Sequence, residues 1–260
     1  MTCELIDSHC HLTSDALLNQ APAVIDRAKA AGVGSIVTIA TDLADAEQAL
    51  ELSRQHSGVH VVCGIHPHEA AKAPANWDAA LIEWVRRDDV IGVGEMGLDY
   101  HYDFSDRRSQ RAVFIRQLEI AQEIGKPIVV HCREAHGDTL QALSGCGRNR
   151  KVVIHCFTGS QAEAEEILEQ GYWISLTGAA TFKRSDELRR VAAMVPDDRL
   201  MIETDSPYLS PEPVRNVRPN EPAHLVHIAA CIAKSRGVTV DELGAMCAAN
   251  TRRFFSLPGP

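Results

Sequence analysis

One pattern repeats along this chain and restricts its fold: a short run rich in valine and isoleucine ends in a polar cluster, and a longer stretch with helical periodicity follows. The eight runs are ELIDSHCHL (4–12), VGSIVTIATD (33–42), VHVVCGIHPH (59–68), VIGVGEMGLDY (90–100), PIVVHCRE (127–134), KVVIHCFTG (151–159), YWISLTGA (172–179) and RLMIETDSPYL (199–209). Runs that are apolar at nearly every position are typical of parallel strands covered on both faces. The pattern therefore predicts an α/β fold.

The segments between these runs have the periodicity of amphipathic helices. Examples are residues 21–32, 105–125, 160–171 and 184–195. Gly32, Gly125 and Gly171 stand where each of three helices would end, as expected for a helix that stops in the left-handed conformation. Ser160 and Ser185 are predicted N-caps, because each precedes a helical pattern with acidic residues in its first turn. Strands that alternate with such helices indicate βαβ units and a parallel sheet.

Eight alternations within 260 residues favour a closed (β/α)₈ TIM barrel. An open, doubly wound sheet is the alternative. The final stretch 238–255 predicts an extra C-terminal helical segment, and the proline-rich segment 206–223 is predicted to be a long loop after the eighth strand. Long loops in compact domains tend to be functional. Since no low-complexity linker divides the chain, we expect a single domain over residues 1–260.

The charge balance and the termini narrow the class of protein further. The chain carries 26 Lys and Arg against 35 Asp and Glu, a formal net charge of −9. It therefore lacks the broad cationic field of a stable duplex-DNA binder, although a nuclease with a locally positive site is compatible with it. No signal peptide and no membrane-spanning stretch is recognisable, so we expect a cytoplasmic protein without membrane association. No protein partner is evident from the sequence.

Imidazoles and carboxylates gather at the ends of the predicted strands. The group comprises His9, His11, Glu95, His131, His155 and Asp205. The carboxyl ends of barrel strands meet on one face, where active sites are built, so these residues would come together from distant parts of the sequence. His9 and His11 are two positions apart on one strand, so both point to the same side. Imidazole is the commonest metal ligand near neutral pH, and the group predicts a metal centre.

The number of ligands predicts how many ions are bound. Four histidines and two carboxylates exceed the three protein ligands of a typical one-zinc catalytic site. We therefore expect two divalent metal ions about 3.5–4 Å apart, their identity (Mg²⁺, Mn²⁺ or Zn²⁺) being left open by such ligands. The predicted division is His9, His11 and Asp205 on one ion, His131 and His155 on the other, and Glu95 between them. The alternative is a single ion, with the remaining histidines contacting the substrate.

Two further residues are predicted to bind substrate phosphate. Two divalent ions and two carboxylates leave a locally positive mouth, which attracts phosphate and lowers the pKa of bound water toward about 7. His66 is kept out of helical geometry by Pro67, and Arg133 can donate to two phosphate oxygens. The alternative for Arg133 is a salt bridge with Glu134 or Asp99.

The sequence gives weaker indications of a function for the residues next to these. His68 is predicted to lie behind the ligands or at the surface, and Asp99 and Tyr100 to orient ligand histidines or to line the pocket. Aromatic residues make up 5% of the chain, so no platform for stacking several bases is evident. Tyr100, Tyr102 and Phe157 are the residues that could stack a single base.

Other common chemistries lack their motifs. No serine lies in a G-x-S-x-G elbow, and neither a Walker loop nor a G-x-G-x-x-G run is present, which argues against serine hydrolases, ATPases and dinucleotide-binding enzymes. None of the eight cysteines forms a C-x-x-C pair. Cys10, Cys132 and Cys156 each adjoin a predicted ligand, but strand alternation turns them away from the mouth, so we interpret them as wall residues.

The same stretches resemble the TatD family of metal-dependent hydrolases, among the amidohydrolase-like TIM barrels. The motifs are DSHCHL (7–12), GIHPH (64–68), GEMGLDYH (94–101), PIVVHCREA (127–135), HCFTGS (155–160), ETDSPYL (203–209) and RPNEPAHL (218–225). The resemblance spans nearly the whole chain in order. It implies a (β/α)₈ two-metal enzyme, with 3′→5′ exodeoxyribonuclease activity as reported for some members.

Carried over by position, the family's metal ligands fall on the six residues of the predicted centre, and its phosphate-side histidine falls on His66. The sequence departs from the family in the last loop. Here VRPNEP (217–222) stands where many relatives read G-K-R-N-E-P, which moves the basic residue to Arg218 and Arg215.

These features predict an enzyme that acts on DNA 3′ ends or on a small phosphodiester substrate. A hydroxide on or between the two metals would attack phosphorus, with Asp205 and Glu95 as the catalytic carboxylates and Asp205 helping to take the proton of the nucleophile. His66 and Arg133 would hold the non-bridging oxygens.

Two other functions are compatible with a metal-containing barrel. The first alternative is an amide, lactone or ester hydrolase. Related amidohydrolases commonly bridge their metals with a modified lysine, whereas Glu95 is the candidate here and no lysine ends a predicted strand. The second is a non-enzymatic interaction subunit with structural metals. Structural sites are usually closed and four-coordinate, unlike six ligands at an open rim.

Overall fold

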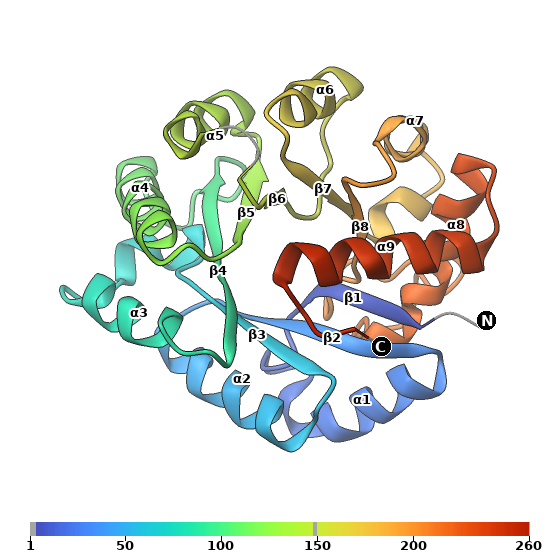
Figure 1. Ribbon diagram of the computed structural model, residues 1–260, viewed down its shortest axis with the longest axis horizontal. Coiled ribbons are helices and arrows are strands. Elements are labelled where there is room, and N and C mark those ends of the chain that lie inside the picture. The colour runs from blue at the N-terminus through green and yellow to red at the C-terminus, as the bar shows by residue number, and fades with distance from the viewer. Residues whose placement is uncertain (1–3, 148–149, 260) are drawn as a thin grey trace.

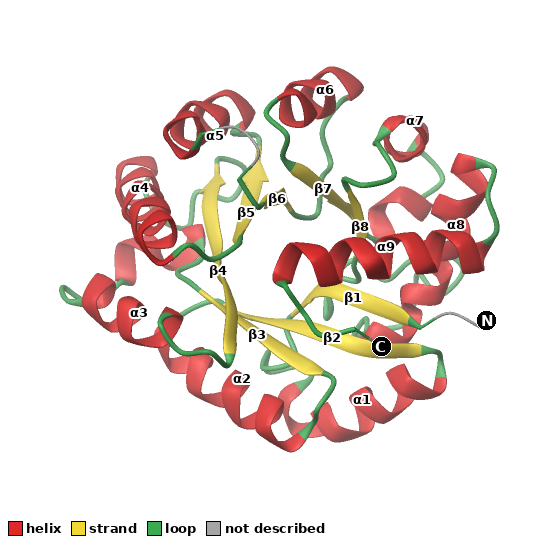
Figure 2. Cartoon of the chain, viewed as in Figure 1, coloured by secondary structure: helices red, strands yellow, loops and turns green. Residues whose placement is uncertain are grey.

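The computed structural model describes residues 4–147 and 150–259, in which eight strands form one sheet in the order β1 to β8 with every neighbouring pair parallel (Figures 1 and 2). The strands are β1 (Leu5–Cys10), β2 (Val33–Ala40), β3 (Val59–Cys63), β4 (Val90–Asp99), β5 (Ile128–Arg133), β6 (Val152–Ile154), β7 (Trp173–Leu176) and β8 (Leu200–Ile202). Each strand lies within one of the eight runs marked by the sequence pattern. The predicted (β/α)₈ barrel is confirmed, and the open sheet is excluded.

The barrel closes where β1 meets the segment that follows β8. The backbone amide of Asp205 donates to the carbonyl of His9 at 3.0 Å, and the amide of His11 donates to the carbonyl of Ser206 at 2.7 Å. These two bonds hold the carboxyl ends of the first and last strands side by side. Residues about 200 positions apart in sequence therefore share one rim of the barrel.

Helices surround the sheet (Figure 2). They are α1 (Ala21–Ala30), α2 (Leu43–Gln55), α3 (Trp77–Val85), α4 (Arg107–Ile124), α5 (His136–Leu143), α6 (Gln161–Glu169), α7 (Asp186–Met194), α8 (Leu225–Arg236) and α9 (Val240–Phe255). Short 3₁₀ helices are η1 (Leu18–Gln20), η2 (Pro67–Lys72), η3 (Ser144–Cys146), η4 (Gly178–Thr181) and η5 (Pro222–His224). The predicted C-terminal helical segment is confirmed as α9. In the described ranges, none of these helices has both the length and the apolar character needed to cross a membrane.

The helix boundaries follow local chemistry. Gly125 ends α4 with φ 81°, and Gly32 and Gly171 also have φ values in the left-handed region that glycine adopts without strain. Ser160 caps α6 in a reciprocal capping box with Glu163. Ser185 precedes α7 but makes no capping hydrogen bond through its side chain, so only the first of the two predicted N-caps acts as one. The predicted long loop is present: η5 is the one helix described between β8 and α8.

Two layers of apolar side chains form the core. Alternation along β2 turns Ile36 outward, toward the helices, and Val37 and Ile39 inward, into the barrel. Phe254 and Phe255 of α9 join the inner layer, and the ring of Phe255 lies beside Gly92, near the start of β4. Figure 1 shows α9 crossing the barrel. Its aromatic end packs at the amino-terminal side of the strands, and the opposite rim carries the polar residues.

Candidate metal centre

The first group of predicted ligands comes from β1 and the segment after β8. His9 Nε2 and His11 Nε2 lie 3.3 Å apart. Asp205 Oδ1 lies 3.4 Å from His11 Nε2 and 3.9 Å from His9 Nε2. Asp205 has φ 53°, a left-handed conformation that aspartate tolerates better than most residues. The turn directs its carboxylate toward the two imidazoles, so the three ligands predicted for one ion lie together.

Glu95, in the middle of β4, faces this group with one of its two oxygens. Oε2 lies 3.2 Å from His9 Nε2 and 3.7 Å from His11 Nε2. The side chain is almost completely buried. A carboxylate with one oxygen on this group can contact a second group only through Oε1.

Oε1 of Glu95 does face a second group, made of three imidazoles from three different strand ends. His155 Nε2 lies 2.7 Å from it, His131 Nδ1 lies 2.8 Å from it, and His66 Nε2 lies 3.2 Å from it. The six predicted ligands therefore meet at one rim of the barrel. His66, predicted to contact phosphate, lies as close to Glu95 as the first group does.

A glycine allows β4 and β5 to approach closely enough for these contacts. Gly97 has φ 145°, and a Cβ atom at this position would lie 1.9 Å from the carbonyl oxygen of His131. Any larger residue would push the two strands apart. The G-x-M-G pattern of β4 is thus a requirement for bringing Glu95 beside His131.

Three of the histidines donate their proton away from the centre. His11 donates from Nδ1 to the carbonyl of Ile39 at 3.3 Å. His131 donates from Nε2 to Asp99 Oδ2 at 3.1 Å, and His155 donates from Nδ1 to Glu203 Oε1 at 3.2 Å. A neutral imidazole has one proton, so the nitrogen that faces Glu95 or Asp205 is left with a lone pair. In the neutral state of these rings, the nitrogen that faces the carboxylates can therefore bind a metal ion.

Unsatisfied buried atoms support the same conclusion. Within the described chain, His155 Nε2 and Glu95 Oε2 are buried side-chain atoms without a hydrogen-bond partner. Leaving such an atom unpaired costs about 1–3 kcal/mol, and more for a charged group. Three sets of three side chains have ligand atoms close enough to share an ion: His9–His11–Asp205, His66–Glu95–His131 and His9–His155–Glu203. The residues present therefore fit a metal centre.

The electrostatics favour an ionised Glu95 and two neutral imidazoles, whereas the neighbouring carboxylates outweigh burial and raise the pKa of His11, His131 and His155. Burial by itself raises the pKa of Glu95, but the imidazoles of His155, His66 and His9 outweigh burial and hold that pKa well below its usual range. Burial, assisted by His155, lowers the pKa of His9, and burial lowers the pKa of His66 to about 4. His9 and His66 are thus neutral at physiological pH, which is the state that binds metals.

Asp99 holds two histidines at the edge of the centre. Its Oδ2 accepts hydrogen bonds from His131 Nε2 at 3.1 Å and from His68 Nε2 at 2.8 Å. Its other oxygen accepts the backbone amides of His101 and Tyr102. Asp99 thereby fixes which nitrogen of His131 faces Glu95, the orienting contact predicted from the sequence.

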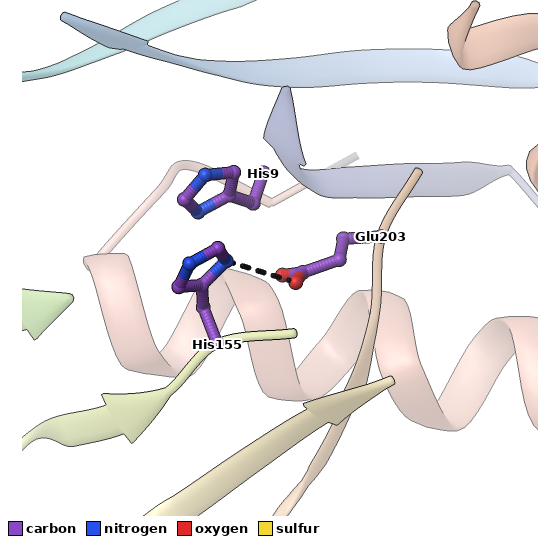
Figure 3. A group of neighbouring side chains, drawn as sticks. All are labelled: His9, His155 and Glu203. Atoms are coloured by element: carbon purple, nitrogen blue, oxygen red, sulfur yellow. Dashed lines mark hydrogen bonds and ion pairs between the residues drawn. The ribbon is translucent and has the colours of Figure 1, made fainter. Parts of the chain in front are cut away.

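Glu203 is a buried carboxylate that the sequence analysis missed. Its Oε1 accepts the Cys156 amide at 2.7 Å as well as His155 Nδ1. The ring of His155 also stacks on that of His9, with centroids 3.8 Å apart, as Figure 3 shows beside Glu203. A signal was available: Glu203 precedes Asp205 by two positions directly after β8, so both residues lie at the same rim.

We expect Glu203→Gln to reduce metal affinity or hydrolytic activity about 10- to 100-fold, the effect typical of losing a partner that orients a metal ligand. The amide oxygen can still accept the Nδ1–H of His155, but the side chain has lost its negative charge and can also present its NH₂ group, so it orients His155 more weakly. Equilibrium dialysis against the metal, together with circular dichroism, separates this effect from misfolding. Glu166→Gln is the matched control, because Glu166 pairs with His136 at 3.0 Å outside the centre. Equal affinity in the two variants would contradict an orienting role for Glu203.

The remaining predicted residues lie around the rim. Arg133 is exposed at the end of β5, and its guanidinium lies 5.0 Å from the ring centroid of Tyr102. Glu134, the alternative salt-bridge partner of Arg133, instead pairs with His101 at 2.7 Å. The sulfur-bearing side chain of Cys10 belongs to the outer core, away from the rim, as predicted for a wall residue.

A parallel barrel of eight strands whose carboxyl ends hold imidazoles around a buried carboxylate is the arrangement expected of a metal-dependent hydrolase. The profile of the family described as TatD related DNase matches residues 6–256. The chain belongs to this family, as the resemblance of its motifs predicts.

Individual relatives are similar to this chain over nearly its full length. The chain is 35% identical to a protein from Citrobacter koseri named 3′-5′ ssDNA/RNA exonuclease TatD, over 97% of this chain and 99% of that protein. It is 34% identical, with the same coverage, to a Bacillus subtilis protein named uncharacterized metal-dependent hydrolase YabD. The crystal structure of a TatD homologue from Escherichia coli superposes with a TM-score of 0.92 at 29% identity, covering 99% of this chain and 100% of the other.

Proposed function

We propose that this protein is a 3′→5′ exonuclease that hydrolyses the terminal phosphodiester bond of single-stranded DNA with the help of two divalent metal ions. The observation that carries the proposal is the position of Glu95, with one oxygen toward His9 and His11 and the other toward His131 and His155. The names of the full-length relatives support the same substrate class.

The residues divide into two metal-binding groups. His9, His11 and Asp205 would hold one ion, and His131 and His155 the other, with Glu95 giving one oxygen to each. Divalent ions bound there would polarise a phosphoryl oxygen and make a bound water acidic enough to lose its proton near neutral pH. His66 lies within the second group: its Nδ1 accepts the His68 amide at 3.1 Å, and its Nε2–H faces Glu95 Oε1 at 3.2 Å, from which a substrate phosphate would have to take that hydrogen bond.

The chain's own side chains would position the substrate and move the proton. Asp205 accepts a proton from the attacking water, whose oxygen bonds to the terminal phosphorus. The bond from phosphorus to the 3′ oxygen of the preceding nucleotide breaks, this oxygen takes up the proton that Asp205 received, and a 5′-mononucleotide leaves. Arg133, exposed at the rim, donates to the non-bridging oxygens together with His66.

The alternative is an amide or lactone hydrolase in which a modified lysine bridges the metal ions. The lysines next to β5 and β6 do not lie at the rim that carries the predicted ligands. Lys126 and Lys151 directly precede β5 and β6, so both lie at the amino-terminal side of the barrel. Lys126 Nζ donates to the carbonyls of Arg87 and Val90 there. In this proposal Glu95 takes the bridging place, which its two oxygens, each facing a different group of imidazoles, support.

An oligonucleotide time course tests the proposal directly. With single-stranded DNA labelled at its 5′ end and Mg²⁺ or Mn²⁺ present, we expect a ladder that shortens one nucleotide at a time, and a 3′ label should appear first as a mononucleotide. Duplex DNA, RNA and ester or lactone substrates are assayed in parallel. Faster turnover of an ester or lactone, without release of nucleotides, would reject the exonuclease in favour of an amidohydrolase-type reaction.

A further inference from the structure

Two exposed aromatic rings lie on the loop between β4 and α4. Tyr102 is 48% exposed and Phe104 is 66% exposed. Their rings are nearly parallel, with an interplanar angle of 15° and centroids 5.3 Å apart. We call this pair the aromatic shelf. Apolar rings that pack on each other at the surface, rather than in the core, present a flat face to solvent.

The aromatic shelf adjoins the metal centre through one histidine. The ring of His68 lies 5.6 Å from that of Tyr102 and 4.8 Å from that of Phe104, edge-on to both. His68 donates to Asp99, which also holds His131. Few side chains therefore separate the shelf from the second group of predicted ligands.

Arginine side chains accompany the shelf, two of them paired with carboxylates: Arg107 with Asp103 at 3.3 Å and Arg111 with Asp138 at 3.0 Å. The guanidinium of Arg133 lies over Tyr102, and that of Arg107 lies 4.1 Å from the ring centroid of Tyr100. Arg107, Arg108 and Arg111 of α4 line a surface hollow of about 420 Å³ next to Tyr100. Cations beside a flat aromatic face, in a chain with a net charge of −9, suit a ligand that combines planar rings with phosphates.

We propose that the aromatic shelf binds a base of the single-stranded nucleic acid, stacked on Phe104, while the terminal phosphodiester lies in the metal centre. The inference rests on the proposed exonuclease function and extends it to a base-binding subsite. Since every base has a flat face, the shelf accepts all four bases and confers affinity rather than sequence preference. Phe104 is the better surface of the pair because it is the more exposed.

The aromatic shelf shares one residue, Tyr102, with the three that the sequence analysis named for stacking a base. Phe157 is buried, and the hydroxyl of Tyr100 donates to Asp138 at 2.6 Å. Of the three predicted residues, Tyr102 has the exposed ring, and Phe104 was missed.

Photochemical cross-linking tests the position of the base without requiring turnover. Oligonucleotides with 5-iodouracil at one of the last three positions, and with phosphorothioate linkages that resist hydrolysis, are irradiated with the metal-loaded wild-type protein, and the modified peptide is identified by mass spectrometry. We expect cross-links to Phe104 or Tyr102 from one of these positions. Tyr208, 58% exposed and 6.1 Å from the ring of His11, is the competing aromatic residue. Cross-links to Tyr208 alone, or none at all, would overturn the proposal.

Variants test the contribution of the shelf to affinity. The double substitution of Tyr102→Ala and Phe104→Ala should weaken binding of oligothymidylate, measured by fluorescence anisotropy, about 5- to 100-fold. Its KM for an oligonucleotide should rise by a similar factor, while kcat and the hydrolysis of a phosphodiester without a base stay within about twofold. Phe104→Trp should retain binding. Val238→Ala, which shortens an exposed apolar side chain in the turn after α8, should bind as the wild type does. Unchanged affinity in the double variant would refute the shelf.

The two proposals fail in distinguishable ways. If the wild-type protein releases no nucleotides but cross-links through Phe104, the exonuclease function is wrong and the base-binding subsite stands. If it releases nucleotides and the double variant behaves as the wild type does, the subsite is wrong and the function stands.

Discussion

Replacement of Glu95 by glutamine is expected to reduce kcat for nucleotide release by about 10³-fold or more. Each Glu95 oxygen faces a separate group of imidazoles, Oε2 toward His9 and Oε1 toward His155. An amide has no negative charge, and its NH₂ group has no lone pair to offer a metal ion. In the proposed two-ion centre, loss of this ligand would remove several kcal/mol of transition-state stabilisation, and about 1.4 kcal/mol corresponds to each factor of ten.

Two substitutions at Glu95 separate the effect of its negative charge from the effect of its side-chain length. Glu95→Asp keeps the carboxylate but is shorter by one methylene, so it cannot contact both groups at once, and we expect activity between that of the wild type and that of Glu95→Gln. Glu119→Gln on α4 is a matched control, since Glu119 pairs with Arg116 on the protein surface. Circular dichroism and thermal melting verify that each variant is folded. Full activity of Glu95→Gln, in protein first stripped of metal and then reloaded, would disprove the central role of this carboxylate.

The sequence was sufficient to predict the barrel and the residues at its rim, because both follow from periodicity. The side chains of a strand alternate, and the carboxyl ends of parallel strands converge, so the positions of His9, His131 and Asp205 at strand ends imply their proximity. The one-residue alternation also predicted that Cys10 turns away from the rim, and the structure places it in the outer core. These predictions needed no knowledge of loop geometry.

The functions of the residues that the sequence analysis did not assign depend on contacts between loops. Glu203 lies beyond the last residue of β8, and its function emerges only when the Cys156 amide and His155 are placed against it. Phe104 follows the end of β4 by five positions, where the direction of a side chain depends on the loop backbone and no period applies. The rotation of His66 toward Glu95 likewise results from the bond between its Nδ1 and the amide of His68 at the start of η2.

Removal of divalent metal is expected to eliminate nucleotide release, and re-addition is expected to restore it. Three imidazoles of the centre, His11, His131 and His155, each have a partner outside it for one ring nitrogen, so the other nitrogen faces the carboxylates and can bind a metal ion. At a metal concentration 100-fold above Kd, each occupied site stabilises the fold by about 2.7 kcal/mol, which corresponds to a rise in Tm of about 5–10 °C. Melting curves with and without EDTA measure this shift independently of activity.

The stoichiometry of reloading decides between the two-ion proposal and the single-ion alternative. When the metal-free protein is titrated, elemental analysis should find two ions per chain at full activity, one held by His11 and its neighbours and the other by His131 and its neighbours. His11→Ala and His131→Ala should therefore each lose one ion and most of the activity. His136→Ala, which removes a histidine paired with Glu166 outside the centre, should keep both. Saturation of activity at one ion per chain would reject the bridging role of Glu95, and activity that persists in fully chelated protein would reject metal-dependent hydrolysis at this centre.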